Sequence, residues 1–524
     1  MRPALWHPAE ALSPLEQSVL RRIRRAKLFV FLRLHRHLIF DAVFQEELAT
    51  LYDDRPKGQP PVPPALLALV TLLQAYTGVG DAEAVEAAVM DRRWQLVLDC
   101  LDCAEAPFSQ GTLVAFRDRL IAAELDRRLI ERTVEIAAQT KGFGQRQLRA
   151  ALDSSPLWGA GRVEDTYNLL GHALRKAIGV LARQQGRELA AEAAQAGAPL
   201  LGGSSLKAAL DCDWDDPAAR AGALGQVLAA LTAVEAHVAA QPASPAQAAA
   251  QESVAVAQQV VQQDVQRRPD GTVALRRGVA PERRISVEDP DMRHGRKSRT
   301  QRVDGYKRHV LRDLDSGLLR AAGVTRANAP EASVTDDLVA DLAPQPVTLS
   351  ELHLDRAYLS STLVQQRAPG LAIFCKAWPV RQGPHFAKTA FHLDWARGLI
   401  QCPGHVQVSF VPGGVVHFPA PCCAVCAVRS QCTDSPHGRS VSIHPDEQLL
   451  AELRERQQTP AGRAALRERV QVEHALAHVG AWQGDRARYR GQRKNLFDLR
   501  RTCVVHNLHV LQRLPDVAAL PPAA

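Results

Sequence analysis

Apolar residues recur every three to four positions through the first part of the chain, a spacing that predicts α-helices. The clearest case is 66–73, which follows a proline-rich break at 60–64 that suits a helix start. Further short helices are predicted at 84–94 and 109–120, so residues 1–145 are expected to form an all-α domain. Short helices with tight glycine turns and basic flanks are compatible with a helix-turn-helix-like DNA-binding module, and a plain helical bundle fits the same features.

Two short runs that end in an aspartate predict β-strands. The first covers 148–153 and ends at Asp153, and the second covers 352–355 and ends at Asp355. Because proline cannot continue a central strand, Pro156 predicts that the first strand stops at Asp153. A carboxylate in this place lies in the crevice where α/β sheets bind their ligands, although aspartate also follows strands simply because it favours turns.

Strand and helix patterns alternate around these aspartates, which predicts a mixed α/β sheet flanked by helices. Residues 303–325 have the pattern of strand, tight turn and strand, 330–342 that of a helix, and 371–375 that of a further strand. Residues 167–299 are rich in alanine and glutamine and predict a helical insertion without recognisable chemistry. The sheet is accordingly expected from three separate segments, 146–166, 300–376 and 446–515.

Basic residues are clustered rather than spread evenly. The chain has 524 residues and a formal net charge of +8, which suggests an anionic partner. Three runs hold many of the lysines and arginines, with few acidic residues among them: 17–40, 292–312 and 484–501. One such run is usually a solvated surface, whereas three that are widely separated favour a polyanion contacted by several domains.

The chain lacks the pattern of a secretion signal or a membrane anchor. Residues 1–17 contain no apolar signal core, and no uninterrupted apolar stretch approaches the ~20 residues that span a bilayer. The sequence therefore predicts a cytoplasmic protein with no membrane partner.

The cysteines are clustered as well, since five of the ten fall within 31 residues of a segment rich in proline and glycine. Cys423 and Cys426 have the spacing of a zinc knuckle, and Cys402 and Cys432 could complete a tetrahedral thiolate site. Cys422, His405 and His417 are spare donors for the same site. In a reducing compartment such a cluster indicates a metal, with reduced core thiols as the alternative. Four cysteine ligands would make a structural Zn²⁺ site in a small zinc-ribbon-like insert at 377–445.

Helical spacing over 461–480 draws attention to a third carboxylate. Glu473 shares one helix face with residues that are apolar or small, namely Leu466, Val470, Ala477 and Gly480. A carboxylate there is costly unless it is paired or bound to metal. Arg469, one turn earlier, offers an intrahelical pair as the simple alternative, but such a pair contributes only ~0.2–0.5 kcal/mol. Together with Asp153 and Asp355, Glu473 could hold two Mg²⁺ ions at a phosphodiester.

Several segments together resemble the bacterial insertion-sequence transposases, whose DDE catalytic core has a ribonuclease-H-like fold. The resemblance covers nearly the whole chain. Leu354-Asp-Arg-Ala-Tyr358 resembles the second acidic motif and Arg469-Val-Gln-Val-Glu473 the third. The other segments that carry it are Gly58-Gln-Pro-Pro-Val-Pro-Pro-Ala-Leu66, Asp81-Ala-Glu-Ala-Val-Glu86, Phe116-Arg-Asp-Arg-Leu120, Leu152-Asp-Ser-Ser155, Asp304-Gly-Tyr-Lys307, Arg488-Tyr-Arg-Gly491, Asn507-Leu508 and the cysteine insert.

The chain departs from this family at two positions. In many relatives a tyrosine stands three residues before the arginine of the third motif, and a lysine stands seven residues after its glutamate. Leu466 and Gly480 occupy those positions here.

The resemblance implies a recombinase that binds the terminal inverted repeats of an insertion sequence, cleaves the DNA ends and joins the 3′ hydroxyl to target DNA. It implies Asp153, Asp355 and Glu473 as ligands of two Mg²⁺ or Mn²⁺ ions. Lys307 and Arg469 would contact phosphate near the cut. Further basic residues would hold the DNA backbone without reading its sequence: Arg488, Arg490, Arg493 and Lys494.

The resemblance also implies double-stranded DNA as the partner, a homodimer assembled on that DNA, and a cytoplasmic, nucleoid-associated location. Two alternatives stay open from the sequence. One is a metal-dependent nuclease on the same fold that does not join strands, and the other is a catalytically decayed DNA-binding regulator.

Overall fold

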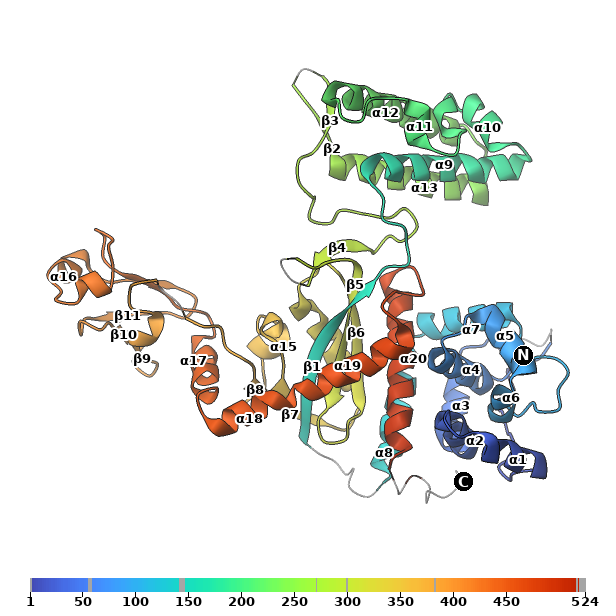
Figure 1. Cartoon of the computed structure of the whole chain (residues 1–524), viewed down its shortest axis with the longest axis horizontal. Helices are drawn as coiled ribbons and strands as arrows, with labels where there is room; N and C mark the ends of the chain where they lie inside the picture. Colours follow the sequence, from blue (N-terminus) through green and yellow to red (C-terminus); the bar gives the residue numbers. More distant parts are fainter. Residues whose placement is uncertain are drawn as a thin grey trace.

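The computed structural model of the chain describes residues 2–54, 59–140, 147–269, 271–297, 300–380, 383–514 and 517. A helical domain, a helical insertion and a cysteine-bearing segment extend from a central sheet in three different directions (Figure 1). Gly58 of the N-terminal motif, and the expected domain boundaries at 145, 146, 299 and 515, lie outside the described residues.

The described N-terminal part is helical, as its hydrophobic spacing predicts. α4 (Pro64–Thr77) is its central helix, and every residue from Pro64 to Ala75 is buried because apolar side chains surround the helix axis. The other helices are α1 (Pro14–Arg22), α2 (Lys27–Ile39), α3 (Ala42–Ala49), α5 (Asp81–Met90), α6 (Arg92–Leu98), α7 (Gln110–Ala122) and α8 (Arg128–Ala138).

Part of the basic run at 17–40 is internal to this helical domain. Arg33 and Arg36 on α2 are each only 2% exposed. Arg33 pairs with Glu16 at 2.5 Å, and Arg36 pairs with Asp99 at 2.8 Å. Since these buried cations already have carboxylate partners within the domain, they hold the domain together, and the interpretation of the run as a polyanion contact does not extend to them.

The central sheet is mixed and six-stranded. β5 is antiparallel to β1 and β6, whereas β7 and β8 run parallel to β1, in the spatial order β6-β5-β1-β7-β8. β4 (Arg293–Arg296) pairs with the start of β5 and belongs to the sheet, although it falls within the range 167–299 expected for the insertion. The bounds are β1 (Gln147–Trp158), β5 (Arg302–Asp313), β6 (Leu319–Arg326), β7 (Thr348–His353) and β8 (Ala372–Phe374).

The prediction that the first strand ends at Asp153 is wrong. β1 pairs with β7 only from Gln147 to Ala151 and then continues beside β5 as far as Trp158. From Leu152 to Leu157 the described residues give the strand a neighbour on one side only, before Trp158 bridges to Arg486, and such an edge position tolerates Pro156. Asp153 therefore lies inside the strand, just past the point where the pairing with β7 stops.

Gly305 allows β5 to pass unusually close to the far end of β1. Its φ angle is +151°, and a Cβ atom there would lie 2.3 Å from the backbone nitrogen of Gly159 and 2.5 Å from the carbonyl oxygen of Leu157. No other residue fits against backbone atoms at these distances. This contact gives a physical reason for the glycine in the Asp304-to-Lys307 segment.

Different helices cover the two faces of the sheet. Leu148 and Leu152 of β1 pack with α14, α15 and α17, whereas Ala151 and Leu157 pack with α19 and α20. Because side chains alternate along a strand, Asp153 points toward the face that α19 covers. The bounds are α14 (Thr335–Leu342), α15 (Thr362–Gln365), α17 (Glu447–Arg456), α19 (Val470–Gln483) and α20 (Gln492–Leu511).

The helix predicted over 461–480 is two helices that meet at Arg469. α18 (Pro460–Glu468) ends just before this residue and α19 begins just after it. The core face of α19 carries Val472, Ala475, Leu476 and Val479. The side chain of Glu473 is 44% exposed, so the stripe predicted to be buried is the open face of the helix. Its small residues leave room for a hollow and do not pack into the core.

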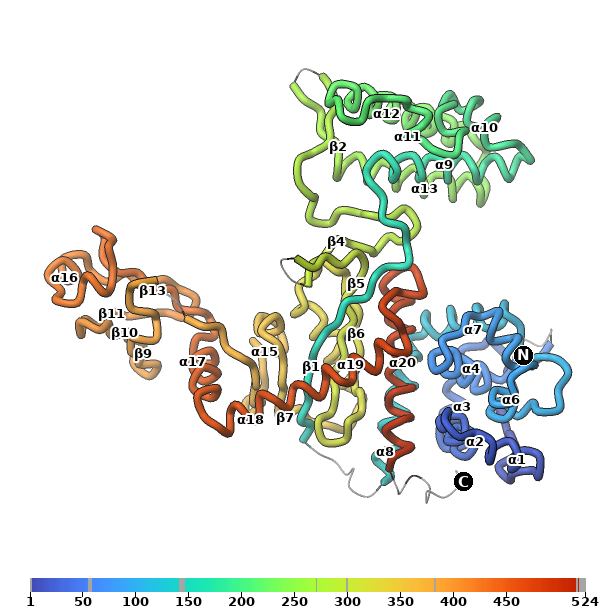
Figure 2. Tube along the Cα trace, in the orientation of Figure 1, coloured from blue at the N-terminus to red at the C-terminus, as the bar shows by residue number. Residues whose placement is uncertain are grey.

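The insertion is a helical unit with its own hydrophobic core. Its two ends lie side by side, since the backbone N–H of Glu164 donates to the carbonyl of Ile285 at 3.0 Å. Figure 2 shows the chain leaving the sheet for this unit and returning to the sheet. Its elements are α9 (Thr166–Gln185), α10 (Leu189–Gln195), α11 (Leu206–Leu210), α12 (Pro217–Ala239), α13 (Pro245–Asp264), β2 (Val265–Arg267) and β3 (Val273–Leu275).

One helix of the insertion, α12, is long and apolar enough to cross a membrane by length and composition, which the sequence pattern did not predict. α4 and α5 meet the same test only as a pair that is bent by 99°. The apolar residues of α12, including Leu224, Val227 and Val234, pack into the core of the insertion. This packing in the core of the insertion is enough to explain why α12 is apolar.

The cysteine-bearing segment contains two small sheets and a short helix, α16 (Ala420–Ala424). Its hydrophobic cluster has only eight buried residues, so apolar burial stabilises it little. The strands are β9 (His392–Asp394), β10 (Leu399–Gln401), β11 (Gln407–Ser409), β12 (Val415–His417) and β13 (Ser440–Ser442).

Buried charges on α20 join the helical domain to the sheet. Arg500, which is 7% exposed, pairs with Asp126 of the turn before α8 at 3.2 Å and with Asp341 of α14 at 2.6 Å. Asp126 is 1% exposed and also pairs with Arg493 at 2.6 Å. Because a buried ion left without its partner is costly, the three elements can pack only in this arrangement.

Asp126→Asn is expected to lower the free energy of unfolding by roughly 3 kcal/mol, because Arg500 would stay buried with only one carboxylate partner. Thermal unfolding followed by circular dichroism measures this as a fall in Tm. Asp118→Asn is the matched control, since the Asp118 carboxylate is half exposed and lies 3.3 Å from Lys494. Its effect should stay within about 0.5 kcal/mol, and equal shifts in the two variants would contradict the assignment.

Candidate functional site

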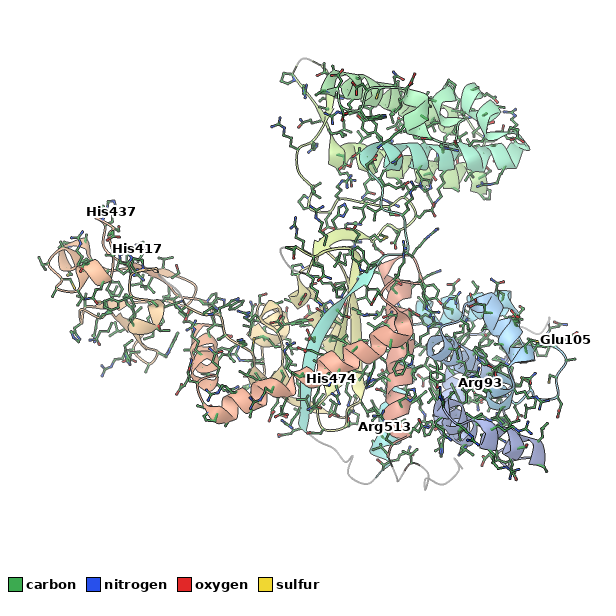
Figure 3. All side chains as sticks on the ribbon, in the orientation of Figure 1. Arg93, Glu105, His417, His437, His474 and Arg513 are labelled. Atoms are coloured by element: carbon green, nitrogen blue, oxygen red, sulfur yellow. The ribbon has the colours of Figure 1, made fainter. Side chains whose placement is uncertain are left out.

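Asp153, Asp355 and Glu473 line one hollow of about 640 Å³. Asp153 comes from β1, Asp355 from the turn just after β7, and Glu473 from the first turn of α19, next to His474 in Figure 3. β1 and β7 are parallel neighbours, and α19 crosses the face toward which Asp153 points. The fold therefore brings together three carboxylates that are far apart in the chain.

Arg469 bridges two of these carboxylates. Its Nη1 donates to Oδ2 of Asp153 at 2.7 Å, and its Nη2 donates to Oε1 of Glu473 at 2.6 Å. Its place at the break between α18 and α19 lets one guanidinium reach both acids. Burial raises the pKa of Asp153, and the positive charge of Arg469 opposes that rise. The intrahelical pair considered from the sequence is thus one arm of a three-residue network.

The third carboxylate, Asp355, is held at the start of a short 3-10 helix, Arg356–Tyr358. Its Oδ1 accepts the backbone N–H of Arg356 at 2.7 Å. The hydroxyl of Tyr358 is buried and forms a hydrogen bond to Nδ1 of His309 on β5 at 2.8 Å. Burial lowers the pKa of His309 to about 3, so the imidazole is neutral. A neutral histidine inside the sheet thereby anchors the turn that carries Asp355.

Arg308 is a cation of the hollow that the sequence did not reveal. It is 3% exposed, its Nε donates to Oγ of Ser155 at 2.7 Å, and its Nη1 donates to Oε1 of Gln483 at 3.0 Å. A Cβ atom on Gly480 would lie 3.0 Å from its Nη2. The guanidinium therefore lies beside the position at which many members of the resembled family carry a lysine.

Two regions of the chain match protein families. Residues 413–512 match a transposase DDE domain, and residues 18–119 match a transposase domain (DUF772). The chain is a DDE transposase. No curated protein and no solved structure matches it.

These matches confirm the family that the resemblance indicated, and with it a class of enzyme that cleaves phosphodiester bonds. A DDE domain implies a ribonuclease-H-like fold, in agreement with the mixed sheet, and it also implies a divalent metal and DNA. The DDE match includes Arg469 and Glu473, whereas Asp153 and Asp355 lie before it. The other match runs from α1 to α7 of the helical domain.

The carboxylates of Asp153, Asp355 and Glu473 do not converge on one metal-ion position. Among the described residues, no group of three or more histidine, cysteine or acidic side chains is placed to hold one metal ion. Asp153 and Glu473 are turned toward Arg469, and Asp355 toward the N–H of Arg356. The donors themselves, three carboxylates at one hollow, are the ligand type that Mg²⁺ and Mn²⁺ prefer.

Three basic residues that the sequence assigned to DNA have partners inside the transposase. Lys307 donates to the carbonyl of Ala329 at 3.0 Å, and it points away from the hollow because its neighbour Arg308 points into it. Arg493 is committed to Asp126. Arg488 donates to the carbonyl of Val79 at 3.4 Å, against the helical domain.

Two further residues that the sequence assigned to DNA are more accessible. Arg490 is 57% exposed and pairs with Glu288, which belongs to the connection between the insertion and the sheet. Lys494 is 49% exposed and lies 3.3 Å from Asp118 of α7. Lys297 was not singled out from the sequence, but it lines the hollow together with Arg469.

Five of the ten cysteines of the transposase line a separate apolar hollow. Cys402, Cys423, Cys426 and Cys432 line it together with Cys422, and all of them are free thiols. A Cβ atom on Gly404 would lie 2.7 Å from Sγ of Cys426 and 3.7 Å from Sγ of Cys402. Burial raises the pKa of the Cys432 thiol, and the nearby thiols add to the rise. The expected zinc-ribbon geometry is not shown within the described residues, because no three sulfurs are placed around one ion.

His309→Gln is expected to make the transposase lose less stability in acid. Since burial holds the pKa of His309 near about 3, against 6.5 for a free histidine, only the unfolded chain takes up this proton as the pH falls between those values. The parent should lose about 2 kcal/mol from this group at about pH 5.

The measurement is the fall in Tm between neutral and mildly acidic buffer, which should be smaller for His309→Gln than for the parent. His437→Gln changes an exposed histidine and should behave like the parent. If both variants lost as much stability as the parent, the buried neutral histidine would not be a source of acid sensitivity.

Proposed function

We propose that the transposase binds the terminal inverted repeats of an insertion sequence, cleaves the DNA at its ends and joins the freed 3′ hydroxyl to target DNA. The observation that carries the proposal is the meeting of Asp153, Asp355 and Glu473 in one hollow beside Arg469 and Arg308. Three carboxylates alone would repel a phosphodiester. They suit one only if cations lie between them and the phosphate, which is the arrangement that a divalent metal and these arginines would provide.

In this proposal Asp153, Asp355 and Glu473 hold Mg²⁺ or Mn²⁺, as two ions. When bound, such ions activate a water-derived nucleophile and stabilise the leaving oxygen. Arg469 opposes the rise that burial causes in the pKa of Asp153, and it holds Asp153 beside Glu473. Arg469 and Lys297 also line the hollow and supply positive charge there, with which they would bind phosphate oxygens.

DNA would reach this hollow across several parts of the molecule. The helical domain would read the inverted repeats, and Arg490 and Lys494 would contact the backbone, because they are the more exposed of the basic residues before and within α20. Lys307, Arg488 and Arg493 are left out of this role, since they are less exposed and each has a partner within the protein. The proposal includes a homodimer assembled on DNA and a cytoplasmic, nucleoid-associated location.

Glu473→Gln is expected to reduce Mg²⁺-dependent cleavage of labelled element ends by at least about 100-fold, because even the outer partners of metal ligands are worth about 10- to 100-fold. Glu452→Gln changes an exposed glutamate on α17 and is the matched control, with cleavage expected at the parent's rate. All three proteins should bind the same DNA equally well in a gel-shift assay. Undiminished cleavage by Glu473→Gln would contradict the assignment of Glu473 as a metal-binding carboxylate.

The same assay separates the competing functions. Pre-cut ends and target DNA should give joined products with the parent. Cleavage without joining would identify a nuclease on this fold, and DNA binding without any cleavage by the parent would identify a decayed regulator.

We also propose that Cys402, Cys423, Cys426 and Cys432 bind a structural Zn²⁺. The proposal is supported by the thiols around one hollow and by the small hydrophobic cluster of eight residues in that segment. Where apolar burial is scarce, zinc binding supplies folding free energy directly. Four thiolate ligands would leave no open position for a substrate.

Atomic spectrometry of the purified protein is expected to find about one zinc per chain, as for a four-thiolate structural site. Cys426→Ser should lose this zinc and become sensitive to protease in the cysteine-bearing segment. Cys103→Ser, at an exposed cysteine of the helical domain, should keep it. A parent without zinc, or a Cys426→Ser variant that retains it, would rule the site out.

A further inference from the structure

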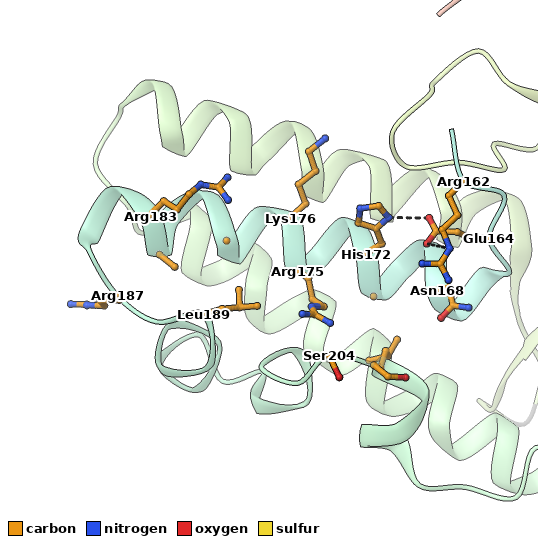
Figure 4. A pocket seen from close by; sticks show the side chains of 15 residues that line it. Arg162, Glu164, Asn168, His172, Arg175, Lys176, Arg183, Arg187, Leu189 and Ser204 are labelled. Carbon is orange, nitrogen blue, oxygen red and sulfur yellow. Dashed lines mark hydrogen bonds and ion pairs between the residues drawn. The ribbon is translucent and has the colours of Figure 1, made fainter. Parts of the chain in front are cut away.

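A further hollow, of about 650 Å³, lies on the helical insertion and shares no lining residue with the carboxylate hollow or the cysteine hollow. One side of it is a single face of α9, on which lining residues recur at steps of three and four: Asn168, His172, Arg175, Lys176, Gly179 and Arg183. The facing side is formed by Leu189 and by residues 204–206 (Figure 4). The hollow is thus a groove between helices, in a unit whose sequence showed no chemistry.

This groove is strongly basic. Five basic side chains line it, namely Arg162, Arg175, Lys176, Arg183 and Arg187. The single carboxylate in its lining, Glu164, is 7% exposed and bonds to Nδ1 of His172 at 3.0 Å. That contact raises the pKa of His172. His172 therefore offsets much of the negative charge of Glu164, and the electrostatic potential in the groove stays positive.

Two of these cations are uncompensated. Arg175 and Arg183 have no hydrogen-bond or ion-pair partner among the residues that the structure describes. Arg36 and Arg493, by contrast, are each committed to a carboxylate. Cations that share a groove repel one another, so an anion that enters it would relieve this repulsion.

The basic side chains of the groove are spread along α9 and do not cluster at one position. Arg175 and Arg183 are eight residues apart on α9, which is about 12 Å along the helix. Successive phosphates of one DNA strand are about 3.4 Å apart along the helix axis, so this span matches a run of phosphates better than a single small anion. Gly179 has no side chain to fill the groove between the two arginines.

One end of the groove is connected to the catalytic core. Glu288 lies 3.3 Å from Nε2 of His172 and 3.7 Å from Nζ of Lys176, both on α9. It also pairs with Arg490, which precedes α20. A duplex held by Arg490 at the core would therefore meet the cations of α9 next.

We infer that this groove binds the phosphate backbone of a DNA duplex that extends beyond the catalytic core. The inference rests on the proposed function for its partner, because the DNA concerned is the substrate of the proposed reaction. The contacts are made by long cationic side chains to phosphate, and such contacts position DNA without specifying its sequence. The insertion thus acts as a second DNA-binding surface of the transposase.

The test uses the full-length double variant Arg175→Ala, Arg183→Ala. Its binding to fluorescent DNA is measured over a range of salt concentrations, with a short end duplex and with one extended by roughly two helical turns, or about 21 base pairs. The affinity for the extended duplex should fall equally for any added sequence. The slope of log K against log salt should become shallower by about 1.8, because two phosphate contacts are lost.

The matched control is Arg267→Ala, Arg277→Ala, which removes the same charge from two exposed arginines of the insertion outside the groove. It should bind the extended duplex like the parent. Both double variants should keep the parent's Tm and circular dichroism, since none of the four side chains is fully buried.

The outcomes separate this inference from the proposed function. If the Arg175, Arg183 variant kept the parent's affinity and salt slope, the groove would not be a DNA surface, even with cleavage intact. If the parent failed to cleave but its salt slope still depended on these two arginines, the inference would stand and the proposed function would fall. Preference for an RNA duplex over DNA, or saturation of the groove by inorganic phosphate with no effect on DNA binding, would overturn the inference.

Discussion

The buried ion pairs of α20 are the constraint on which the rest of the structure depends. A guanidinium removed from water costs several kcal/mol unless carboxylates meet it, so Arg500 can be buried only with Asp126 and Asp341 in place. One acid belongs to the helical domain and the other to a helix that packs on β6. α20 therefore fixes the helical domain, the sheet and α19 relative to one another, and with them the wall of the carboxylate hollow.

Charge balance also governs the hollow itself. Asp153 and Glu473 would repel each other at close range, and Arg469 removes that repulsion by donating to both. Two neutral groups, Tyr358 and His309, hold the turn that carries Asp355, so this support adds no charge to the hollow. Three carboxylates and the guanidinium groups of Arg308 and Arg469 thus line the same hollow, so groups that attract a cation lie beside groups that attract a phosphate.

Residue types and periodicity were enough to predict the helical domain, the α/β sheet and the acids that lie together, although the catalytic role of those acids stays a prediction. Other features of the fold and of the hollow depend on strand register and on contacts between elements, which the residue pattern does not specify. The course of β1 past Asp153 depends on β7 ending early, and the importance of Arg308 depends on its pairing opposite Ser155. A sequence also shows where charges are but not whether they are paired. Arg36 lies in a basic run yet is internal, whereas Arg183 lies in none yet has no partner among the described residues.

The adjacency of the two ends of the insertion, from Glu164 to Ile285, has a consequence for the order in which the molecule folds. β1 and β5 are neighbours in the sheet, but the whole insertion separates them in the chain. Closing a loop of that length costs about 2 kcal/mol more than closing one a tenth as long. If the insertion forms its own core first, it brings the ends of the two strands together and that extra entropic cost disappears. During synthesis the insertion precedes β5, so the unit that is peripheral in the finished molecule is the one whose early folding prepares the sheet.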